Sequence, residues 1–510
     1  MAGGKELEDT HRKQPWGLRW RSSVGFVTFV VMFGILTDQL AYSLIIPVIP
    51  YQLGALGYNG IAAKLSWLLV AFSGTLVLTT PLIAHYSEVY RNRKIPLIAG
   101  LVSLTVSQIM FMEAPAYWLM VLARVLQGLS ATVIWTVGLA LLCDTVPERS
   151  LGRQFGITSV GLTIGNLVGP PVGGALYQRW GFRAPFIFGI IFAGIDLVAR
   201  LLLVERHEAI RWGVDPMDIS AGDKNMSPEA ASEVTASERT EKPPMTASHS
   251  APHQRNGDSP VGGSEAQIEV GIEAELREGD QTEKESKPRV TLLPHIVLLK
   301  LMKSPRATVC IVVSLVWGLV WIAQETTVVL HMNRVWGLDP DQAGIAFIAA
   351  VVPTIFSTAI SGWLGDKYGS APVGCAAIFL SLPWYGLITI EGSLAMFLTF
   401  LALEAFFASC LIPMVMLELS SVGRTVESVG YAHVYGALSL AYGIGTTVGP
   451  IIAGQMYDHI ERGWFAIGFT AMGLMSVLFV LALFMLGERP LGVRLLRNKE
   501  RTPVEQSSGQ

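Results

Sequence analysis

Charged residues are scarce in this sequence. Of its 510 residues only 15% are Asp, Glu, Lys or Arg, whereas 51% are hydrophobic, and the mean hydropathy is +0.46. Soluble domains usually carry about 25% charged residues. A water-soluble chain of this length would need more polar surface to cover its core. The composition therefore excludes an ordinary soluble domain and predicts an integral membrane protein.

Several functional classes lack their sequence signatures. The net charge is only -3, and no basic stripe interleaved with aromatic residues is present, so we expect no nucleic-acid partner. The four cysteines are far apart and show neither CxxC nor Cys/His zinc spacing, so we expect small buried hydrophobes and no metal site. The nine histidines form no HExxH motif. We therefore expect neither an enzyme nor a bound cofactor.

Long apolar runs, in contrast, recur along the whole chain. A helix needs about 20 such residues to cross a bilayer. The first run is too long for the apolar part of a signal peptide, so we expect it to remain as a span. The predicted spans are residues 23–47, 63–85, 96–113, 116–142, 154–177, 183–204, 306–330, 341–364, 371–390, 394–419, 428–457 and 463–487. The predicted fold is an all-α polytopic membrane protein with twelve transmembrane helices in two six-helix bundles, residues 23–204 and 305–487.

The two predicted bundles are separated by residues 205–304. From Asp215 to Lys287 this segment is rich in Ser, Glu, Thr, Lys, Pro and Gly and has no aromatic residue. Such a composition buries too little apolar surface to offset the entropy of ordering. We predict a cytosolic, largely disordered linker, either a plain tether or a regulatory segment. Residues 1–22 and 488–510 are predicted cytosolic tails.

Lys and Arg are distributed unevenly between the two sides of the predicted bundle. The positive-inside rule places the side with more of these residues in the cytosol. That side receives both tails and the loops after every second span. Its basic residues include Arg91, Arg93, Lys94, Arg149, Arg153, Lys367 and Arg424. We therefore expect both termini in the cytosol, with the protein in the plasma membrane or a vacuolar or vesicular membrane.

An internal repeat links the two halves. The fifth predicted span contains Gly165, Gly169, Pro170, Gly173 and Gly174, and the eleventh contains Gly445, Gly449, Pro450 and Gly454. Matched residues such as Gly165 and Gly445 lie 280 positions apart. Glycines four apart let helix backbones approach closely, and proline bends a helix. Two copies at the same place in each half predict a paired conformational element rather than chance helix packing.

A second repeated feature follows the second span of each half. In the C-terminal half the sequence Gly362 to Gly369 includes Asp366 and Lys367, and the N-terminal counterpart carries Glu88. An acid at the mouth of a helix can form a charge latch between neighbouring helices. Ordinary positive-inside loop charge explains the basic residues equally well, but it explains the glycine-spaced acid less well.

Together these motifs resemble the major facilitator superfamily, and the resemblance covers the chain outside the tails and linker. Arg124, Gln127 and Gly128 match the family's RxxQG motif, and the motif at Gly169-Pro170 is similar to that of its proton antiporters. The resemblance implies two six-helix bundles related by an axis along the membrane normal, with substrate bound between them. Ala84 and Val89 depart from the pattern of the acid–base loop, which puts the N-terminal latch in doubt.

Within that family the sequence resembles the drug:proton antiporters and vesicular amine transporters. Asp38 precedes a proline pair in the first span, and Glu325 lies in the seventh. Asp196 and Glu418 match further family acids. Thr326 replaces the proline that follows the family glutamate, so the local bend and the substrate can differ.

Ionisable residues inside spans are expensive and are functional candidates by default. We expect Asp38 and Glu325 to face one cavity, where each could hold either a proton or a cationic substrate. Arg124 is either part of proton coupling or a structural ion-pair partner, and Gln127 could hydrogen-bond across the cavity. Glu418 is a further candidate, although it lies near the interface. Asp196 and Arg200 are four residues apart, so a pair within one helix explains them. Candidate cavity-lining residues are Tyr42, Trp135, Trp317, Trp321, Gln324 and Tyr435.

The sequence therefore predicts a secondary active transporter that works by alternating access. We expect proton-coupled antiport, as efflux or vesicular sequestration, of a small organic molecule that is cationic or amphipathic. A proton-coupled nutrient or sugar symporter of the same fold is the alternative. The expected partners are the substrate, protons and the lipid bilayer, with the proton gradient as the energy source, and the expected state is a monomer.

Overall fold

In the N-terminal half, the described residues form helices joined by short loops. The computed structural model describes residues 14–59, 61–90, 92–217, 294–338, 340–426, 429–488 and 490–492. The N-terminal helices are α1 (Leu18–Arg21), α2 (Val24–Ile45), α3 (Ile49–Ala55), α4 (Ile61–Tyr90), α5 (Lys94–Met112), α6 (Tyr117–Val133), the π-helical turn η2 (Ile134–Gly138), α7 (Leu139–Thr145), the short η3 (Glu148–Ser150), α8 (Leu151–Trp180), α9 (Ala184–Leu202) and α10 (Arg206–Ile210).

The C-terminal half repeats this succession of long helices. Its elements are α13 (Pro294–Met302), α14 (Pro305–Trp336), α15 (Pro340–Tyr368), α16 (Ser370–Leu387), α17 (Leu394–Ser409), α18 (Leu411–Thr425), α19 (Tyr431–His459) and α20 (Gly463–Met485). The tenth predicted span is divided into α17 and α18 at Cys410. Pro413 explains this break, because its nitrogen has no hydrogen to donate to the carbonyl of Ser409.

Each of the twelve predicted spans corresponds to one helix or to consecutive helices of the structure, with ends that differ by several residues at most. Ten of these segments are long and apolar enough to cross a membrane by length and composition alone. The other two are α8 and α15. Their apolar residues are diluted by glycine, proline and hydroxyl side chains, and the two helices pack on each other. Burial against another helix, rather than lipid, accounts for their polar character.

The predicted linker begins and ends with helix. Residues 218–293 lie outside the described residues, but α10 and α13 fall inside the predicted range 205–304. Ala209 of α10 packs on Leu18 and Val204, and Val297 and Leu301 of α13 join the main hydrophobic core. These apolar residues flank the polar stretch from Asp215 to Lys287, so both ends of the linker range can bury a face against the bundles.

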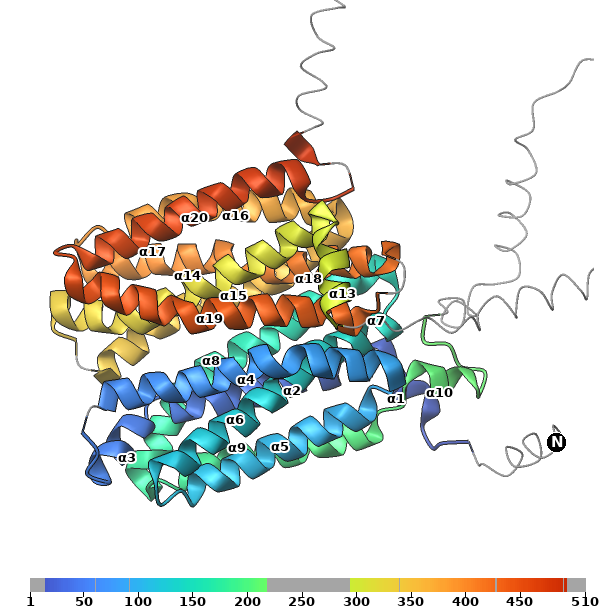
Figure 1. Cartoon of the computed structure of the whole chain (residues 1–510), viewed down its shortest axis with the longest axis horizontal. Helices are drawn as coiled ribbons and strands as arrows, with labels where there is room; N and C mark the ends of the chain where they lie inside the picture. Colours follow the sequence, from blue (N-terminus) through green and yellow to red (C-terminus); the bar gives the residue numbers. More distant parts are fainter. Residues whose placement is uncertain are drawn as a thin grey trace, which may run out of the picture. The chain divides into compact units, whose positions relative to one another are not determined.

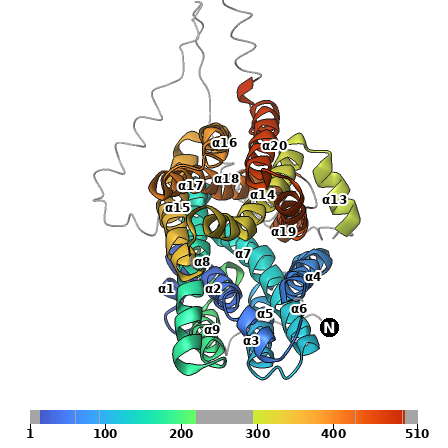
Figure 2. The same ribbon diagram turned by 90° about the vertical axis from the view of Figure 1, so that its left-hand side faces the viewer.

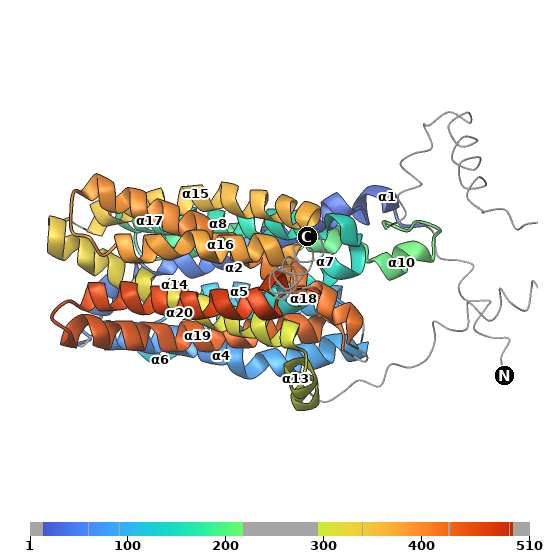
Figure 3. The same cartoon turned by 90° about the horizontal axis from the view of Figure 1, so that it is seen from above.

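The two halves pack with equivalent helices in equivalent places. Inside the N-terminal half α2 packs on α8, and inside the C-terminal half α14 packs on α19. Between the halves α8 packs on α15 and α4 packs on α19 (Figures 1 and 2). In Figure 3 the long helices run roughly alongside one another. We call the end of the bundle that carries residues 92–93, 146–150, 369, 426 and 429–430 the basic end.

A central cavity between the two bundles

The repeated glycines hold the first and fifth helices of each half in close contact. A Cβ atom on Gly165 would lie 2.8 Å from Cβ of Gln39, and one on Gly169 would clash with Ser43 Oγ, both on α2. In the other half a Cβ on Gly445 would clash with the carbonyl of Leu315, and one on Gly449 would lie 2.6 Å from that of Leu319, both on α14. The two copies therefore perform the same packing task.

Not every glycine of the motif has this role. A Cβ on Gly173 would clash with the carbonyl of Leu44, but one on Gly174 or Gly454 would meet no atom within 4 Å. Pro170 and Pro450 lie inside continuous helices, α8 and α19. Pro450 also lines the central cavity. The packing function thus belongs to the residues at 165, 169, 173, 445 and 449.

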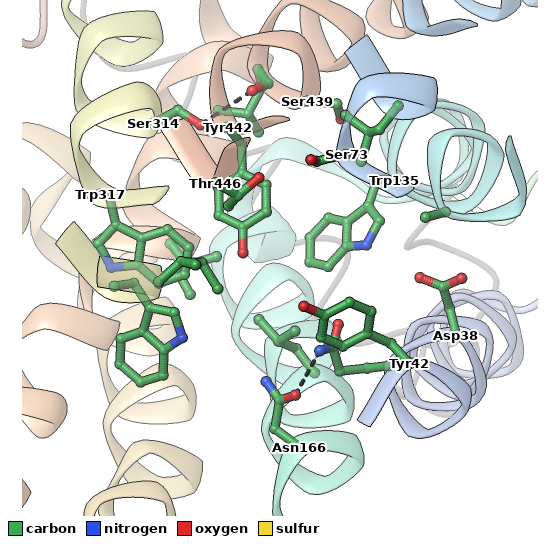
Figure 4. Close-up of a pocket in the computed structure, with 18 of the residues that line it drawn as sticks. Asp38, Tyr42, Ser73, Trp135, Asn166, Ser314, Trp317, Ser439, Tyr442 and Thr446 are labelled. Atoms are coloured by element: carbon green, nitrogen blue, oxygen red, sulfur yellow. Dashed lines mark hydrogen bonds between the residues drawn. The ribbon is translucent and has the colours of Figure 1, made fainter. Parts of the chain in front are cut away.

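Residues from both halves enclose this central cavity. Its lining comes from α2, α4, α6, η2 and α8 on one side and from α14, α18 and α19 on the other. Asp38 and Glu325 both belong to the lining, one from each half. Six aromatic side chains also line it, namely Tyr42, Phe72, Trp135, Trp317, Trp321 and Tyr442. Figure 4 shows Asp38 and Tyr42 on one side of the cavity and Trp317 on the other.

The aromatic walls are fixed by ring contacts and by one polar pair. Trp317 stacks on Trp321 and Tyr442, with ring centroids 5.8 and 5.5 Å apart. Gln39 donates a hydrogen bond of 2.6 Å to Asn166, which connects α2 to α8 at the cavity wall (Figure 4). A second space lined by Asn166, Trp317 and Glu325 adjoins the first. Trp135 belongs to η2, and such π-helical turns are frequent at functional sites.

Asp38 is largely buried, with 3% of its surface exposed, and its Oδ1 has no hydrogen-bond partner in the described part of the chain. The charged groups that act on it are Arg200 and Asp196. As the sequence suggested, these two form an ion pair within α9, at 2.6 Å. Glu325 is less buried than Asp38 and faces the cavity from α14.

Arg124 lies outside the cavity lining and is fully buried. Its Nη1 donates to Oε1 of Gln127 at 2.8 Å, and its guanidinium lies over the rings of Tyr42 and Phe111, at 5.3 and 5.5 Å. It forms no ion pair within the residues that the structure describes. Gln127 therefore contacts Arg124 of its own helix and does not reach across the cavity, contrary to the sequence-based expectation. The three-residue spacing of the motif explains this contact.

The remaining acidic candidate, Glu418, lies away from the cavity. Its carboxylate accepts a hydrogen bond of 2.6 Å from Arg306 Nε, and it also accepts from Ser370 and from the amide of Gly487. Glu418 thus ties α18 to α14, to α16 and to the end of α20. Two predicted lining residues are also displaced. Gln324 is buried beside Glu404, and Tyr435 contacts Cys143 between the halves.

The two acid–base loops form equivalent latches at the basic end. Asp366, at the end of α15, accepts hydrogen bonds from the amides of Gly152 and Arg153 in the first turn of α8, at 2.6 and 2.7 Å. Glu88, at the end of α4, accepts from the amide of Ala432 in the first turn of α19, at 2.8 Å. A carboxylate is favoured there by the unpaired amides and dipole of a helix N-terminus.

The N-terminal latch therefore exists despite Ala84 and Val89. Gly152 and Ala432 are related by the same 280-residue offset as the glycine motifs. Lys367 is not part of either latch, since its ammonium lies over the rings of Trp363 and Tyr368. Arg93 takes the basic role in the first loop, because it pairs with Glu88 and Asp144, each at 3.0 Å. The sequence left Arg93 open between a latch residue and ordinary positive-inside loop charge.

Two further contacts join the halves at the basic end. Arg424 of α18 pairs with Glu148 at 2.5 Å, and Cys143 Sγ lies 3.2 Å from the hydroxyl of Tyr435. The latches and these contacts hold the two halves together and close the basic end. Two six-helix halves with a closed end and a shared central cavity define the architecture of a secondary transporter.

Comparison with known proteins identifies the family. The model of the Major Facilitator Superfamily matches residues 31–330 and 307–507, so this chain belongs to that family and is a multi-pass membrane transporter. The MFS-type transporter ppzB of Metarhizium rileyi is 24% identical over 96% of this chain and 100% of its own length. The human organic anion transporter MFSD10 shares the fold, with a TM-score of 0.60 and 19% identity over 92% of this chain and 100% of its own.

Relatives of the branch that the sequence resembles match over a shorter region. The probable vesicular acetylcholine transporter-B of Danio rerio is 33% identical over 34% of this chain and 36% of its own length. The quinolone resistance protein NorA of Staphylococcus aureus is 27% identical over 34% of this chain and 44% of its own. These matches agree with the resemblance to drug and vesicular amine transporters.

Proposed function

We propose that this transporter exchanges protons for a small organic cation. The observation that carries the proposal is that each half supplies one carboxylate, Asp38 and Glu325, to a single cavity lined by aromatic rings. Among the described residues, no Lys or Arg belongs to the lining. Acids attract a cation, and aromatic faces stabilise it further by about 0.5–2 kcal/mol per contact. A name among the relatives points the same way, since acetylcholine is an organic cation.

Exchange of protons for the cation follows because both compete for the carboxylates of Asp38 and Glu325. A carboxylate in a partly dry cavity is stabilised either by a proton or by a bound cation, and the two exclude each other. Loading the cation from one side thus releases protons to that side. The glycine-packed pairs α2/α8 and α14/α19 would move as units when the halves rock around the cavity. No resident cofactor is needed, because the proton gradient supplies the energy.

In this conformation the closed basic end prevents substrate from entering the cavity at that end. We propose that this end faces the cytosol, because the positive-inside distribution of Lys and Arg places it there. The cavity would then exchange its contents with the opposite side until the latches at Glu88 and Asp366 open. Proton-coupled export from the cytosol, or sequestration into an acidic organelle, requires this cycle.

The test uses the full chain reconstituted in liposomes with an imposed pH gradient. We expect uptake of radiolabelled tetraphenylphosphonium into vesicles with an acidic interior, with movement of protons in the opposite direction. Asp38→Asn and Glu325→Gln should each reduce this uptake at least about tenfold, since each removes a charge that the cation requires. Glu113→Gln is the matched control, because Glu113 pairs with Arg183 at the surface, outside the cavity.

Three results would overturn the proposal. Uptake driven by an acidic exterior would indicate symport and would favour a nutrient or sugar carrier. Wild-type uptake in both cavity variants would remove the role of the two acids. Failure of the wild type to transport any member of a panel of organic cations, with protein correctly inserted, would exclude this substrate class.

A further inference from the structure

A buried ion pair on α9 lies outside the cavity lining and approaches α2 one turn from Asp38. Arg200 Nη2 and Asp196 Oδ2 are 2.6 Å apart on α9, with side-chain exposures of 4% and 0%. Nη1 of the same guanidinium donates to the carbonyl of Leu97 on α5, at 2.5 Å. The charges of Arg200 and Asp196 both act on Asp38.

The backbone of α2 makes room for this arrangement. A Cβ atom on Gly34 would lie 2.7 Å from Arg200 Nη2 and 2.8 Å from Ile134 Cδ1, so a side chain there would displace one of them. Gly34 and Asp38 are four residues apart and therefore lie on the same face of α2. The guanidinium is thus seated against α2 one turn from Asp38.

The polar atoms of the ion pair and of Asp38, together called the cluster, are incompletely paired. Asp38 Oδ1, Asp196 Oδ1 and Arg200 Nε are buried and lack hydrogen-bond partners in the part of the chain that the structure describes. Unpaired buried polar atoms are costly. A cluster with two open carboxylate oxygens has capacity for one more positive charge or proton.

The net charge of the cluster determines how many protons or cations it binds. Two carboxylates and one guanidinium carry a net charge of about -1 when all three are ionised. A net charge inside the membrane is strongly disfavoured, so the cluster is stable only after it gains one positive charge. Of its members only Asp38 lines the cavity.

We propose that Asp38, Asp196 and Arg200 act as one charge-balanced unit, which holds either one proton or one cation from the cavity. This inference rests on the proposed exchange and adds its stoichiometry at this site. Asp196 and Arg200 do not touch the substrate. They are positioning residues, and together they require that Asp38 release one proton for each cation bound.

Two variants test whether Asp196 and Arg200 act on Asp38 through their charges or only through packing. In Asp196→Asn the cluster retains one acid and one base, so Asp38 is balanced by Arg200 without a proton. In the double variant Asp196→Asn/Arg200→Gln both charges of the pair are gone, and Asp38 again needs a proton or cation. Asp196→Asn should therefore abolish the proton requirement, and the second substitution should restore it.

The protonation of Asp38 can be measured without a substrate. Dicyclohexylcarbodiimide is an apolar reagent that reacts with protonated carboxyl groups, and peptide mass spectrometry locates the product. Labelling of Asp38 in the reconstituted full chain should fall about tenfold or more in Asp196→Asn, because an adjacent guanidinium favours the ionised carboxylate by that factor. It should return to the wild-type level in the double variant. Labelling of Glu325 is the internal reference and should stay constant.

Arg200→Gln provides an independent arm if Asp196→Asn does not fold. The wild type should take at most one label per molecule at Asp38 and Asp196 together, whereas Arg200→Gln should take two. Equal labelling of Asp38 in wild type and Asp196→Asn would overturn the proposal, as would a single label in Arg200→Gln.

A separate measurement tests whether a cation replaces the proton at Asp38. Tetraphenylphosphonium should protect Asp38 of the wild type and the double variant from labelling, but it should not change the low labelling in Asp196→Asn. Unprotected wild-type Asp38 would overturn this half. If the labelling pattern holds while pH-driven transport is absent, the proposed exchange fails and the proton-holding unit stands.

Discussion

At the scale of single residues, the charged candidates inside the bundle have different surroundings. Asp38 and Glu325 line the cavity, whereas Glu418 joins helix ends through Arg306. Arg124 does neither. The sequence left open whether it couples protons or completes an ion pair, and the structure gives it aromatic rings and Gln127 as neighbours. Because it supports Tyr42 from behind, we expect its contribution to come through the cavity wall.

Replacement of Arg124 by methionine tests this interpretation. Two of its nitrogens, Nε and Nη2, lack hydrogen-bond partners in the described structure, so removal of the charge should leave stability unchanged or raise it by about 1–4 kcal/mol. Loss of the contact with Tyr42 should lower pH-driven tetraphenylphosphonium flux up to about tenfold, since such contacts are worth roughly 0.5–2 kcal/mol. Thermal unfolding and vesicle uptake measure the two effects.

Arg183→Met is the control for this experiment. Arg183 pairs with Glu113 at the surface, and such pairs contribute at most about 1 kcal/mol. A fall of 3 kcal/mol or more in Arg124→Met would contradict our interpretation, because it would indicate that a buried ion pair had been broken.

At the scale of elements, the repeat is a pair of helix–helix contacts. Gly165 and Gly169 fit α8 against α2, and Gly445 and Gly449 fit α19 against α14. The repeat also explains the latches, because Gly152 and Ala432 occupy matching first turns of α8 and α19. Gly174 and Gly454 share the motif but face open space. Position within a motif therefore does not by itself assign a packing role.

Alanine substitution at Gly449 and Gly454 distinguishes the two kinds of glycine. Gly449→Ala brings Cβ to 2.6 Å from the carbonyl oxygen of Leu319, so the helices must separate. We expect a loss of about 1–3 kcal/mol in stability. Gly454→Ala on the same helix adds a methyl group to open space and should be neutral or slightly stabilising. Equal melting temperatures for the two variants would refute this assignment.

At the scale of the whole molecule, the conformation is defined by closure at the basic end. Asp366 bridges α15 to α8, Glu88 bridges α4 to α19, and Arg424 bridges α18 to Glu148. Each bridge joins one half to the other. The contacts must break together if the halves are to separate there, so the basic end is a two-state element of the kind that alternating access requires.

Cys143 reports on this closure directly. It is 4% exposed and lies between the halves beside Tyr435. In the double variant Glu88→Gln/Asp366→Asn, the basic end should open more often, and N-ethylmaleimide should modify Cys143 at least about tenfold faster, because hydrogen bonds to charged groups contribute roughly 1.5–3 kcal/mol each. Mass spectrometry of the modified peptide measures the rate.

Two other cysteines serve as controls for the opening experiment. Cys310 and Cys375 are buried inside the C-terminal half, and a rocking motion between the halves leaves their surroundings intact. A parallel rise at all three positions would indicate general unfolding. An unchanged rate at Cys143 would show that the two latches do not hold the basic end closed.

The sequence by itself determined the membrane class, the twelve spans, the repeat and the two cavity acids. These features are local or periodic. A span is visible because about 20 apolar residues suffice to form it, and a repeat is visible because it preserves spacing. Asp38 and Glu325 were identifiable because a charge in an apolar run is rare and costly.

Only the tertiary structure decided which charged groups meet. Glu88 and Asp366 contact residues 344 and 213–214 positions away, respectively. Nothing local in the sequence encodes those pairings. The same holds for the packing of Arg124 under Tyr42, the removal of Glu418 and Gln127 from the cavity, and the seating of Arg200 against Gly34. The position of each of these side chains depends on which way its helix face points after the helices have packed. Contacts between segments distant in the sequence fix that orientation.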